Sequence, residues 1–166
     1  MASHACALLL LACASAWPGW IAAATSQSFQ VSATITAGCL VVGGVSNYGS
    51  LAFGSQSALS TSTVRVALTW GVQLQCTPGV TLNMTVDGGQ YNSSGRHMQL
   101  NSGSARVAYQ LFRDAGYSQS LGIGQSVAVA YSDANNISLP IYGQVQLPGN
   151  QPGGTYSDVL QVQLSW

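Results

Sequence analysis

Residues 156–166 of this 166-residue chain read Y-S-D-V-L-Q-V-Q-L-S-W and indicate its fold class. From Leu160 onward every second side chain is apolar, and the side chains between them are Gln or Ser. Alternation with a period of two predicts a β-strand that buries one face. Because this stretch closes the sequence, we expect it to need a neighbouring strand from elsewhere. The apolar set is Leu160, Val162, Leu164 and Trp166.

A second stretch with the same pattern lies near the other end of the sequence. Phe29, Val31, Ala33 and Ile35 alternate with Gln, Ser and Thr just before Cys39. This stretch is separate from the later strands and resembles one strand placed before the start of the domain. The two stretches together predict a subunit that pairs with another chain.

Residues 1–24 are interpreted as a signal peptide that is removed on export. Leu and Ala dominate residues 7–16, and residues 22–24 supply the small side chains that signal peptidase needs. The usual basic flank is missing, which leaves the true start codon open. A rival interpretation places a lipid on Cys13, at the end of an L-L-A-C box. No other stretch has the roughly 20 apolar residues of a membrane-spanning helix, so the mature protein is expected to be soluble.

Charge is scarce in this chain. Four Arg stand against four Asp, Lys and Glu are absent, and the net charge is zero. Four scattered cations form no basic patch, so nucleic acid is not a predicted partner. A surface with so little charge suits a protein that is packed in an assembly. Residues 25–166 are enough for one domain with a hydrophobic core.

Removal of the leader would leave two cysteines, Cys39 and Cys76. In an exported chain such a pair is expected to form one disulfide, and two free buried thiols are the alternative. A metal site would need more ligands than the single remaining histidine, His97, can help to supply. The sequence therefore predicts no metal and no cofactor.

The chain after the leader is predicted to be all-β. The longest alternation, from Val64 to Cys76, predicts one central strand, and a turn at residues 77–79 would join it to residues 80–86 in a hairpin. No window has the period of an amphipathic helix, so short strands between Gly- and Asn-rich turns favour a sandwich. Further strands are expected at residues 106–113 and 127–131, with a pair of short ones within 137–147.

Catalytic chemistry has few candidates in this sequence. His97 lies in a Gly/Ser-rich stretch and is expected on a surface loop, and no Gly-x-Ser-x-Gly elbow occurs. The aspartates are isolated from one another, so a paired-carboxylate site is not predicted. The protein is therefore expected not to be an enzyme.

A series of short patches extends over residues 28–166. In order they are F-Q-V-S-A-T-I at 29–35, T-A-G-C at 36–39, Y-G-S-L-A-F-G at 48–54, L-Q-C-T at 74–77, V-D-G-G at 86–89, Arg96, A-Y-Q-L-F-R-D at 108–114, L-P-I-Y-G at 139–143 and G-T-Y-S-D at 154–158. By their order and spacing these patches resemble subunits of the archaic, Csu-type chaperone-usher pili, which belong to the spore coat protein U domain family.

The resemblance implies an incomplete immunoglobulin-like sandwich at residues 39–166, with six strands and the final strand missing. A donor strand from another subunit would complete it. In such families a periplasmic chaperone fills the open groove during export, and at the outer-membrane usher the tail of the next subunit replaces the chaperone. Residues 25–38 would be the donor tail, with Phe29, Val31, Ala33 and Ile35 entering the groove. The acceptor groove, which also binds the chaperone, would be bounded by Leu160, Val162, Leu164 and Trp166.

The function that this resemblance implies is that of a structural subunit of a bacterial surface pilus, which supports adhesion and biofilm formation. The subunit would be exported through the periplasm to the cell surface. Its partners would be copies of itself or related pilins, the chaperone and the usher. A secreted spore-coat-like or surface coat protein and a single-domain adhesin are the alternatives. An adhesin would be expected to bind its ligand at exposed aromatics among Tyr91, Tyr117 and Tyr131.

Overall fold

The computed structural model describes residues 30–44, 48–69 and 71–166, and these residues form ten β-strands and no helix. No helix that could cross a membrane occurs in the described ranges. The prediction of an all-β chain is confirmed. The strands are β1 (Cys39–Val41), β2 (Thr63–Ala67), β3 (Leu74–Cys76), β4 (Asn83–Val86), β5 (His97–Leu100), β6 (Arg106–Phe112), β7 (Val127–Ala128), β8 (Tyr142–Gln146), β9 (Tyr156–Ser157) and β10 (Val162–Ser165).

The chain separates into two units, residues 1–34 and residues 35–166. Of the first unit only residues 30–34 are described, and they form no strand. The predicted signal peptide and Cys13 lie outside the described residues. The second unit contains all ten strands, so it carries the fold.

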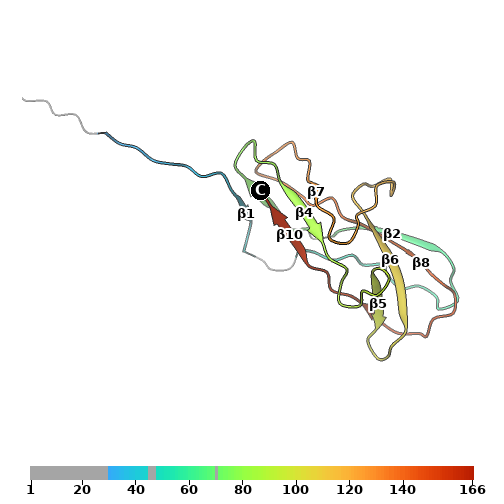
Figure 1. Cartoon of the computed structure of the whole chain (residues 1–166). Helices are drawn as coiled ribbons and strands as arrows, with labels where there is room; N and C mark the ends of the chain where they lie inside the picture. Colours follow the sequence, from blue (N-terminus) through green and yellow to red (C-terminus); the bar gives the residue numbers. More distant parts are fainter. Residues whose placement is uncertain (1–29, 45–47, 70) are drawn as a thin grey trace, which may run out of the picture. The chain divides into compact units, whose positions relative to one another are not determined.

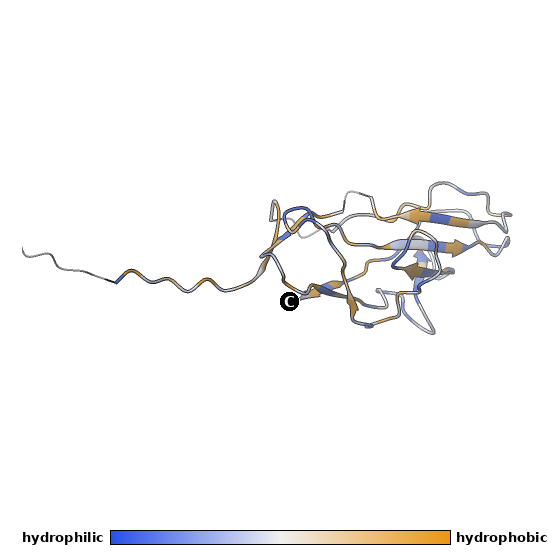
Figure 2. Cartoon of the chain, turned by 90° about the horizontal axis from the view of Figure 1, so that it is seen from above, coloured by the Kyte–Doolittle hydropathy of each residue, from blue (hydrophilic) through white to orange (hydrophobic). Residues whose placement is uncertain are grey.

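The strands form three antiparallel sheets (Figure 1). Five strands are ordered β2-β8-β6-β5-β9, three are ordered β10-β4-β7, and β1 pairs with β3. Apolar and polar residues alternate along the strands, as Figure 2 shows. The inward side chains of all three sheets meet in one core, which is the arrangement of an immunoglobulin-like sandwich. Fully buried members are Leu74, Met84, Val86, Leu111 and Val145.

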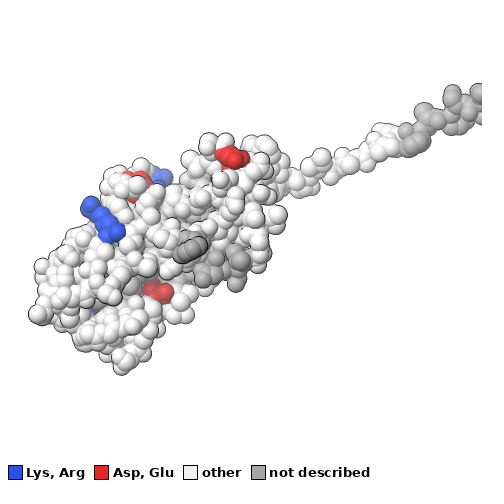
Figure 3. All heavy atoms as spheres, turned by 180° about the vertical axis from the view of Figure 1, so that it is seen from behind, with Lys and Arg blue, Asp and Glu red and all other residues white. Residues whose placement is uncertain are grey.

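Charged side chains are few and separated on the face of the molecule that Figure 3 shows. This distribution follows from the composition, with four cationic and four anionic residues in the whole sequence. Such a surface offers no patch of one sign that could attract a polyanion.

The predicted central strand from Val64 to Cys76 is divided in the structure. Its first part, β2, pairs with β8, whereas its last part, β3, pairs with β1. Between them Thr69 forms an isolated bridge with Ser50, and Gly71 offers no side chain to pack. At the described residues of this stretch the alternation marks the inward face correctly, but it does not reveal which neighbour each part pairs with.

The predicted hairpin at residues 77–79 is wrong. The turn is present, with the amide of Val80 donating to the carbonyl of Thr77 at 3.2 Å. However, β4 pairs with β10 and β7 and not with β3. The chain crosses here from one sheet to another, because residues 77–82 are too many for the tight two-residue turn that folds a strand back on its neighbour.

Two further expectations need correction. His97 is not in a surface loop but begins β5, where it lies opposite Ala108 of β6 and its Nδ1 bonds with the Gly95 carbonyl at 2.8 Å.

Ten short strands stand where six were expected, because irregular residues interrupt the longer stretches. Within residues 137–147 only β8 is a full strand, and Ile137 forms an isolated bridge with Leu74. The strand expected at 106–113 is present as β6, whereas the one expected at 127–131 is limited to the two residues of β7.

The buried Arg96 binds backbone carbonyls around the end of β4. Its guanidinium donates to Val86 at 2.9 Å, Asp87 at 2.8 Å, Leu121 at 2.6 Å and Gly122 at 3.3 Å. Burial lowers the pKa of this side chain from its ordinary value. The four carbonyls satisfy a cation that would otherwise be costly to bury, and they join β4 to the segment that leads into β7.

Asp158 anchors the segment that leads into β10. Its Oδ1 accepts hydrogen bonds from the amides of Gln90 and Val159, both at 2.9 Å, and its Oδ2 accepts one from the Tyr109 hydroxyl at 2.7 Å. A Cβ on Gly89, which has φ of +81°, would lie 2.0 Å from Oδ2. A larger residue at position 89 would therefore displace the carboxylate.

The predicted disulfide is present and joins β1 to β3. Cys39 and Cys76 are 37 residues apart in the sequence, and their Cα atoms are 4.0 Å apart. Beside the disulfide, the amide of Thr77 donates to the Gly38 carbonyl at 2.8 Å. The residue at which the tail enters the domain is therefore held to β3 by both covalent and hydrogen bonds.

Replacing both cysteines, Cys39→Ser with Cys76→Ser, should lower the free energy of unfolding by about 4 kcal/mol, because a loop of this length loses its closure in the unfolded chain. Urea denaturation of the oxidised protein and of the double variant measures the difference. The chemically reduced parent protein is the control and should match the variant. Equal midpoints for the oxidised and reduced proteins would contradict the prediction.

The Tyr109 phenol should make stability fall at alkaline pH. Burial, and then the hydrogen bond to Asp158, raises the pKa of this phenol above its ordinary value. The resulting stabilisation is complete below the pKa of an unfolded tyrosine, about 10, and is lost as the pH rises above it. Tyr109→Phe should cost about 1 to 2 kcal/mol at neutral pH and should weaken the alkaline decline, as measured by denaturation across pH. Parallel pH profiles for the two proteins would argue against this role.

Candidate functional site

The strand β10 has a partner on one side only among the described residues. It is an edge strand whose neighbour is β4. Backbone hydrogen bonds alternate along an antiparallel pair, and the Asp87 amide donates to the Gln161 carbonyl at 3.1 Å. Odd-numbered residues of this stretch therefore bond toward β4. The backbone groups that point to the open side belong to Leu160, Val162 and Leu164.

From Leu160 to Ser165 the side chains divide between the core and solvent as the sequence predicted, whereas Trp166 does not join the buried face. Leu160, Val162 and Leu164 pack against the core but are only partly buried, and the residues between them are exposed. Trp166 is 59% exposed. Its indole nitrogen would lie 3.8 Å from a Cβ on Gly38, so the ring lies beside the entry of the tail.

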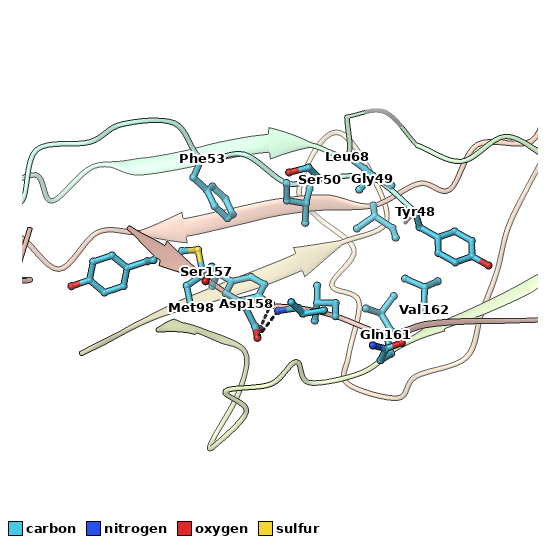
Figure 4. A pocket seen from close by; sticks show the side chains of 17 residues that line it. Tyr48, Gly49, Ser50, Phe53, Leu68, Met98, Ser157, Asp158, Gln161 and Val162 are labelled. Carbon is cyan, nitrogen blue, oxygen red and sulfur yellow. Dashed lines mark hydrogen bonds between the residues drawn. The ribbon is translucent and has the colours of Figure 1, made fainter. Parts of the chain in front are cut away.

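A groove of about 620 Å³ lies along the open side of this stretch (Figure 4). One wall is the segment 156–162, which leads into β10. The other wall is residues 48–53, which we call the facing wall. In Figure 4 the facing wall runs opposite Asp158, Gln161 and Val162, with the lining side chains between the two. Deeper lining side chains are those of Leu68, Val86, Met98, Tyr109 and Ile141.

Backbone hydrogen bonds and apolar contacts hold the facing wall against the domain, and Tyr48, Leu51 and Phe53 pack against the core. Ser50 and Thr69 exchange backbone hydrogen bonds at 3.0 and 2.9 Å. A Cβ on Gly143 would lie 3.0 Å from Phe53 Cζ, so the absence of a side chain at position 143 lets Phe53 cross β8 closely. The Phe53 ring also lies 6.4 Å from the ring of Tyr109, centre to centre. The described residues give no backbone hydrogen bond between the facing wall and residues 156–162.

The groove continues into a second hollow of about 490 Å³. The two hollows share Leu51, Phe53, Met98 and Tyr156, so they form one continuous depression. Residues 54–58 and 147–155, which have no regular structure, flank the second hollow. This end of the depression lies between loops.

The lining of the groove is suited to binding apolar side chains. Asp158 is its one charged residue, and both of its oxygens already accept hydrogen bonds. The described residues contain no cluster of His, Cys, Asp or Glu that could hold a metal ion. His97 does not line the groove. Most side chains that line the groove are apolar, and the backbone groups of Leu160 and Val162 beside it have no strand partner among the described residues.

The residues predicted for the groove are only partly brought together. Leu160 and Val162 line it, whereas Leu164 packs against the core beyond it and Trp166 lies beside Gly38. Sequence reasoning did not assign the facing wall to the groove. Its signal was the patch Y-G-S-L-A-F-G at 48–54, in which Leu51 and Phe53 alternate around a small residue.

The residues predicted for the donor tail are exposed where they are described. Val31 is 82% exposed and Ile35 is 88% exposed, and Ala33 is exposed between them. None of the three lies in a strand, and Phe29 lies outside the described residues. The tail therefore carries a row of apolar side chains without cover.

The tyrosines that an adhesin could use have structural contacts. Tyr117 lies under the Arg65 guanidinium at 4.9 Å and packs edge-on against Phe112 and Tyr142. The Tyr131 hydroxyl donates to the Val80 carbonyl. Tyr91 lies under the Arg106 guanidinium at 5.7 Å. These contacts do not favour the aromatics as a ligand site.

Solved structures with a similar fold come from pilus systems. A chain of the CsuC–CsuE chaperone–tip adhesion subunit pre-assembly complex, from the archaic chaperone-usher Csu pili of Acinetobacter baumannii, matches 80% of this chain with a TM-score of 0.51 and 14% identity. A chain of a chaperone–tip adhesin complex of CFA/I fimbriae biogenesis matches 78% with a TM-score of 0.45 and 12% identity. The match spans 41% of each of those chains.

No curated protein sequence matches this chain significantly. The profile of the spore coat protein U domain matches residues 25–163, which include the tail and nearly all of the sandwich. This agrees with the order of patches in the sequence and with the immunoglobulin-like fold. The chain belongs to the spore coat protein U domain family.

Proposed function

We propose that this protein is a structural subunit of a bacterial surface pilus that assembles by donor-strand exchange. The observation that carries the proposal is the free edge of β10 beside the apolar groove. A free strand edge over partly exposed core residues invites an added strand, whose backbone supplies affinity and whose alternate side chains supply register. The fold and family are those of structural subunits, and no enzymatic step is proposed.

The donor is the tail of another copy or of a related pilin. Phe29, Val31, Ala33 and Ile35 fall on one face of an extended strand, as do the four apolar residues from Leu160 to Trp166. Both stretches span seven residues, so one can run along the other over its whole length. Burying two branched aliphatic side chains, a phenyl ring and a methyl group would contribute about 5 to 9 kcal/mol before backbone hydrogen bonds are counted. Residues 25–38 carry no charge, which suits the apolar lining.

Export would follow the route of the similar pilus systems. The Acinetobacter baumannii structure is a pre-assembly complex of a chaperone with a subunit. By analogy, a periplasmic chaperone fills the groove of this chain, and an outer-membrane usher exchanges the chaperone for the next tail. Residues 1–24 would direct export, residues 25–38 would donate, and residues 39–166 would accept. Fibres on the cell surface would then support adhesion and biofilm formation.

Deletion of residues 25–37 should abolish polymerisation, because the donor strand is lost while the acceptor groove remains. In cells that supply the chaperone and the usher, the truncated chain should accumulate as a chaperone-bound monomer. Size-exclusion chromatography and electron microscopy of surface extracts distinguish the two states. Fibres of normal length from the truncated chain would contradict the proposed donor role of the tail.

A pair of adjacent substitutions separates donor contact from a general effect on the tail. Val31→Arg would force a cation into the groove and should reduce polymer yield at least about tenfold, since the lost burial alone is worth about 1.5 kcal/mol or more. Ser32→Arg places the same side chain on the opposite face of the strand and should leave polymer yield near the parent level. Equal polymer yields from the two variants would contradict the predicted register.

A further inference from the structure

We infer that the Cys39–Cys76 disulfide carries tension from the donor tail directly into the inner strand β3 and keeps the facing wall of the groove out of the path of that tension. The inference rests on the proposed function, because only a subunit linked through both its tail and its groove is pulled at two places. The effect of the disulfide on the groove would appear when the assembled fibre is stretched.

The donor tail is attached to the domain through a short edge strand. The tail enters the domain at Gly38 and Cys39, at the start of β1. β1 has only three register pairs with β3, and the described residues give it no strand on its other side. After β1 come Gly43 and Gly44, both at positive φ and both exposed. Without a covalent bond, a pull on the tail would act on a short edge ladder.

The next part of the chain after β1 is the segment that forms the facing wall. The facing wall follows β1 within a few residues of sequence. Its backbone hydrogen bonds to the domain include the exchange between Ser50 and Thr69, and the Val72 amide donates to the Tyr48 carbonyl at 3.4 Å. If β1 were peeled from β3, tension would reach this wall next. Removing the wall would open the groove on one side and release the donor strand of the neighbouring subunit.

The disulfide changes this path. It joins Cys39 to Cys76 with their Cα atoms 4.0 Å apart, so little slack remains. Residues 40–75, which include β1 beyond its first residue, the facing wall and β2, lie inside the closed covalent loop. Tension that enters at Cys39 crosses to Cys76 and leaves the loop unstretched.

The strand that receives the tension is held on both sides. β3 pairs with β1 on one side, and on the other Leu74 exchanges backbone hydrogen bonds with Ile137 at 2.9 and 3.0 Å. The Cys76 amide also donates to the Ala134 carbonyl at 2.8 Å. The Leu74 side chain is 1% exposed, so β3 is anchored in the core.

From β3 the path to the groove is short. Residues 77–82 lead into β4, and β4 forms the ladder with β10 over four register pairs. β10 is the strand whose free edge would hold the incoming donor. Tension would therefore run from the tail through the disulfide, β4 and β10 to the next subunit, and the facing wall would stay in place to cover the donor.

Force spectroscopy on assembled fibres tests this path. Oxidised fibres held between two surfaces should rupture without releasing residues 40–75. After reduction in place, each subunit should show an added extension of up to about 130 Å, which is 37 residue steps of about 3.6 Å, and should rupture at lower force. Fibres of the Cys39→Ser, Cys76→Ser variant should behave like the reduced ones. Because reduction is applied after assembly, the test does not depend on the variant folding.

An unloaded measurement separates this inference from the proposed function. A synthetic peptide of residues 26–37 should bind the oxidised and the reduced full chain with affinities within a few fold, because the groove walls are intact when nothing pulls on them. If the peptide binds but reduced and oxidised fibres give the same extension and rupture force, the tension path is overturned while the proposed function stands. If the peptide and the tail of another copy bind neither form, the proposed function fails and the tension path fails with it.

Discussion

In the described part of the chain, β10 has a partner strand on one side and an open edge on the other. Backbone N–H and C=O groups that leave water need hydrogen-bond partners, and among the described residues β10 pairs only through the groups that face β4. The apolar side chains on its buried face reach a core that is left partly open along the groove. On the proposed function, an extended segment between β10 and the facing wall would complete the domain.

The fold keeps this opening in shape by fixing one side of it firmly. Asp158 ties the segment before β10 to Tyr109 and to the loop at Gly89, and the Asp87 carboxylate accepts from the Gln161 amide at 2.9 Å. Arg96 holds the end of β4 through four carbonyls. The facing wall has fewer bonds of its own, and the disulfide encloses it in a covalent loop. One wall is held by hydrogen bonds of its side chains, and the other lies within the covalent loop that the disulfide closes.

The composition suits a molecule whose surface packs against other subunits of the same type. With four charges of each sign in the whole sequence, the domain has little electrostatic repulsion to oppose close packing. All four aspartates of the sequence instead accept hydrogen bonds from backbone amides or hydroxyls, in turns and at the groove. Ionic attraction contributes little to the proposed assembly, which depends on apolar burial and a strand ladder.

Sequence patterns were enough to predict the all-β class, the inward residues of most strands and the pairing of Cys39 with Cys76. The period of two follows from local strand geometry, and only these two cysteines would be left if residues 1–24 were removed as predicted. The structure was needed to show that the stretch ending at Cys76 divides between two sheets, that residues 48–53 form the second wall, and that Arg96 is buried. Strand pairing and burial depend on contacts between residues far apart in sequence, which no local pattern encodes.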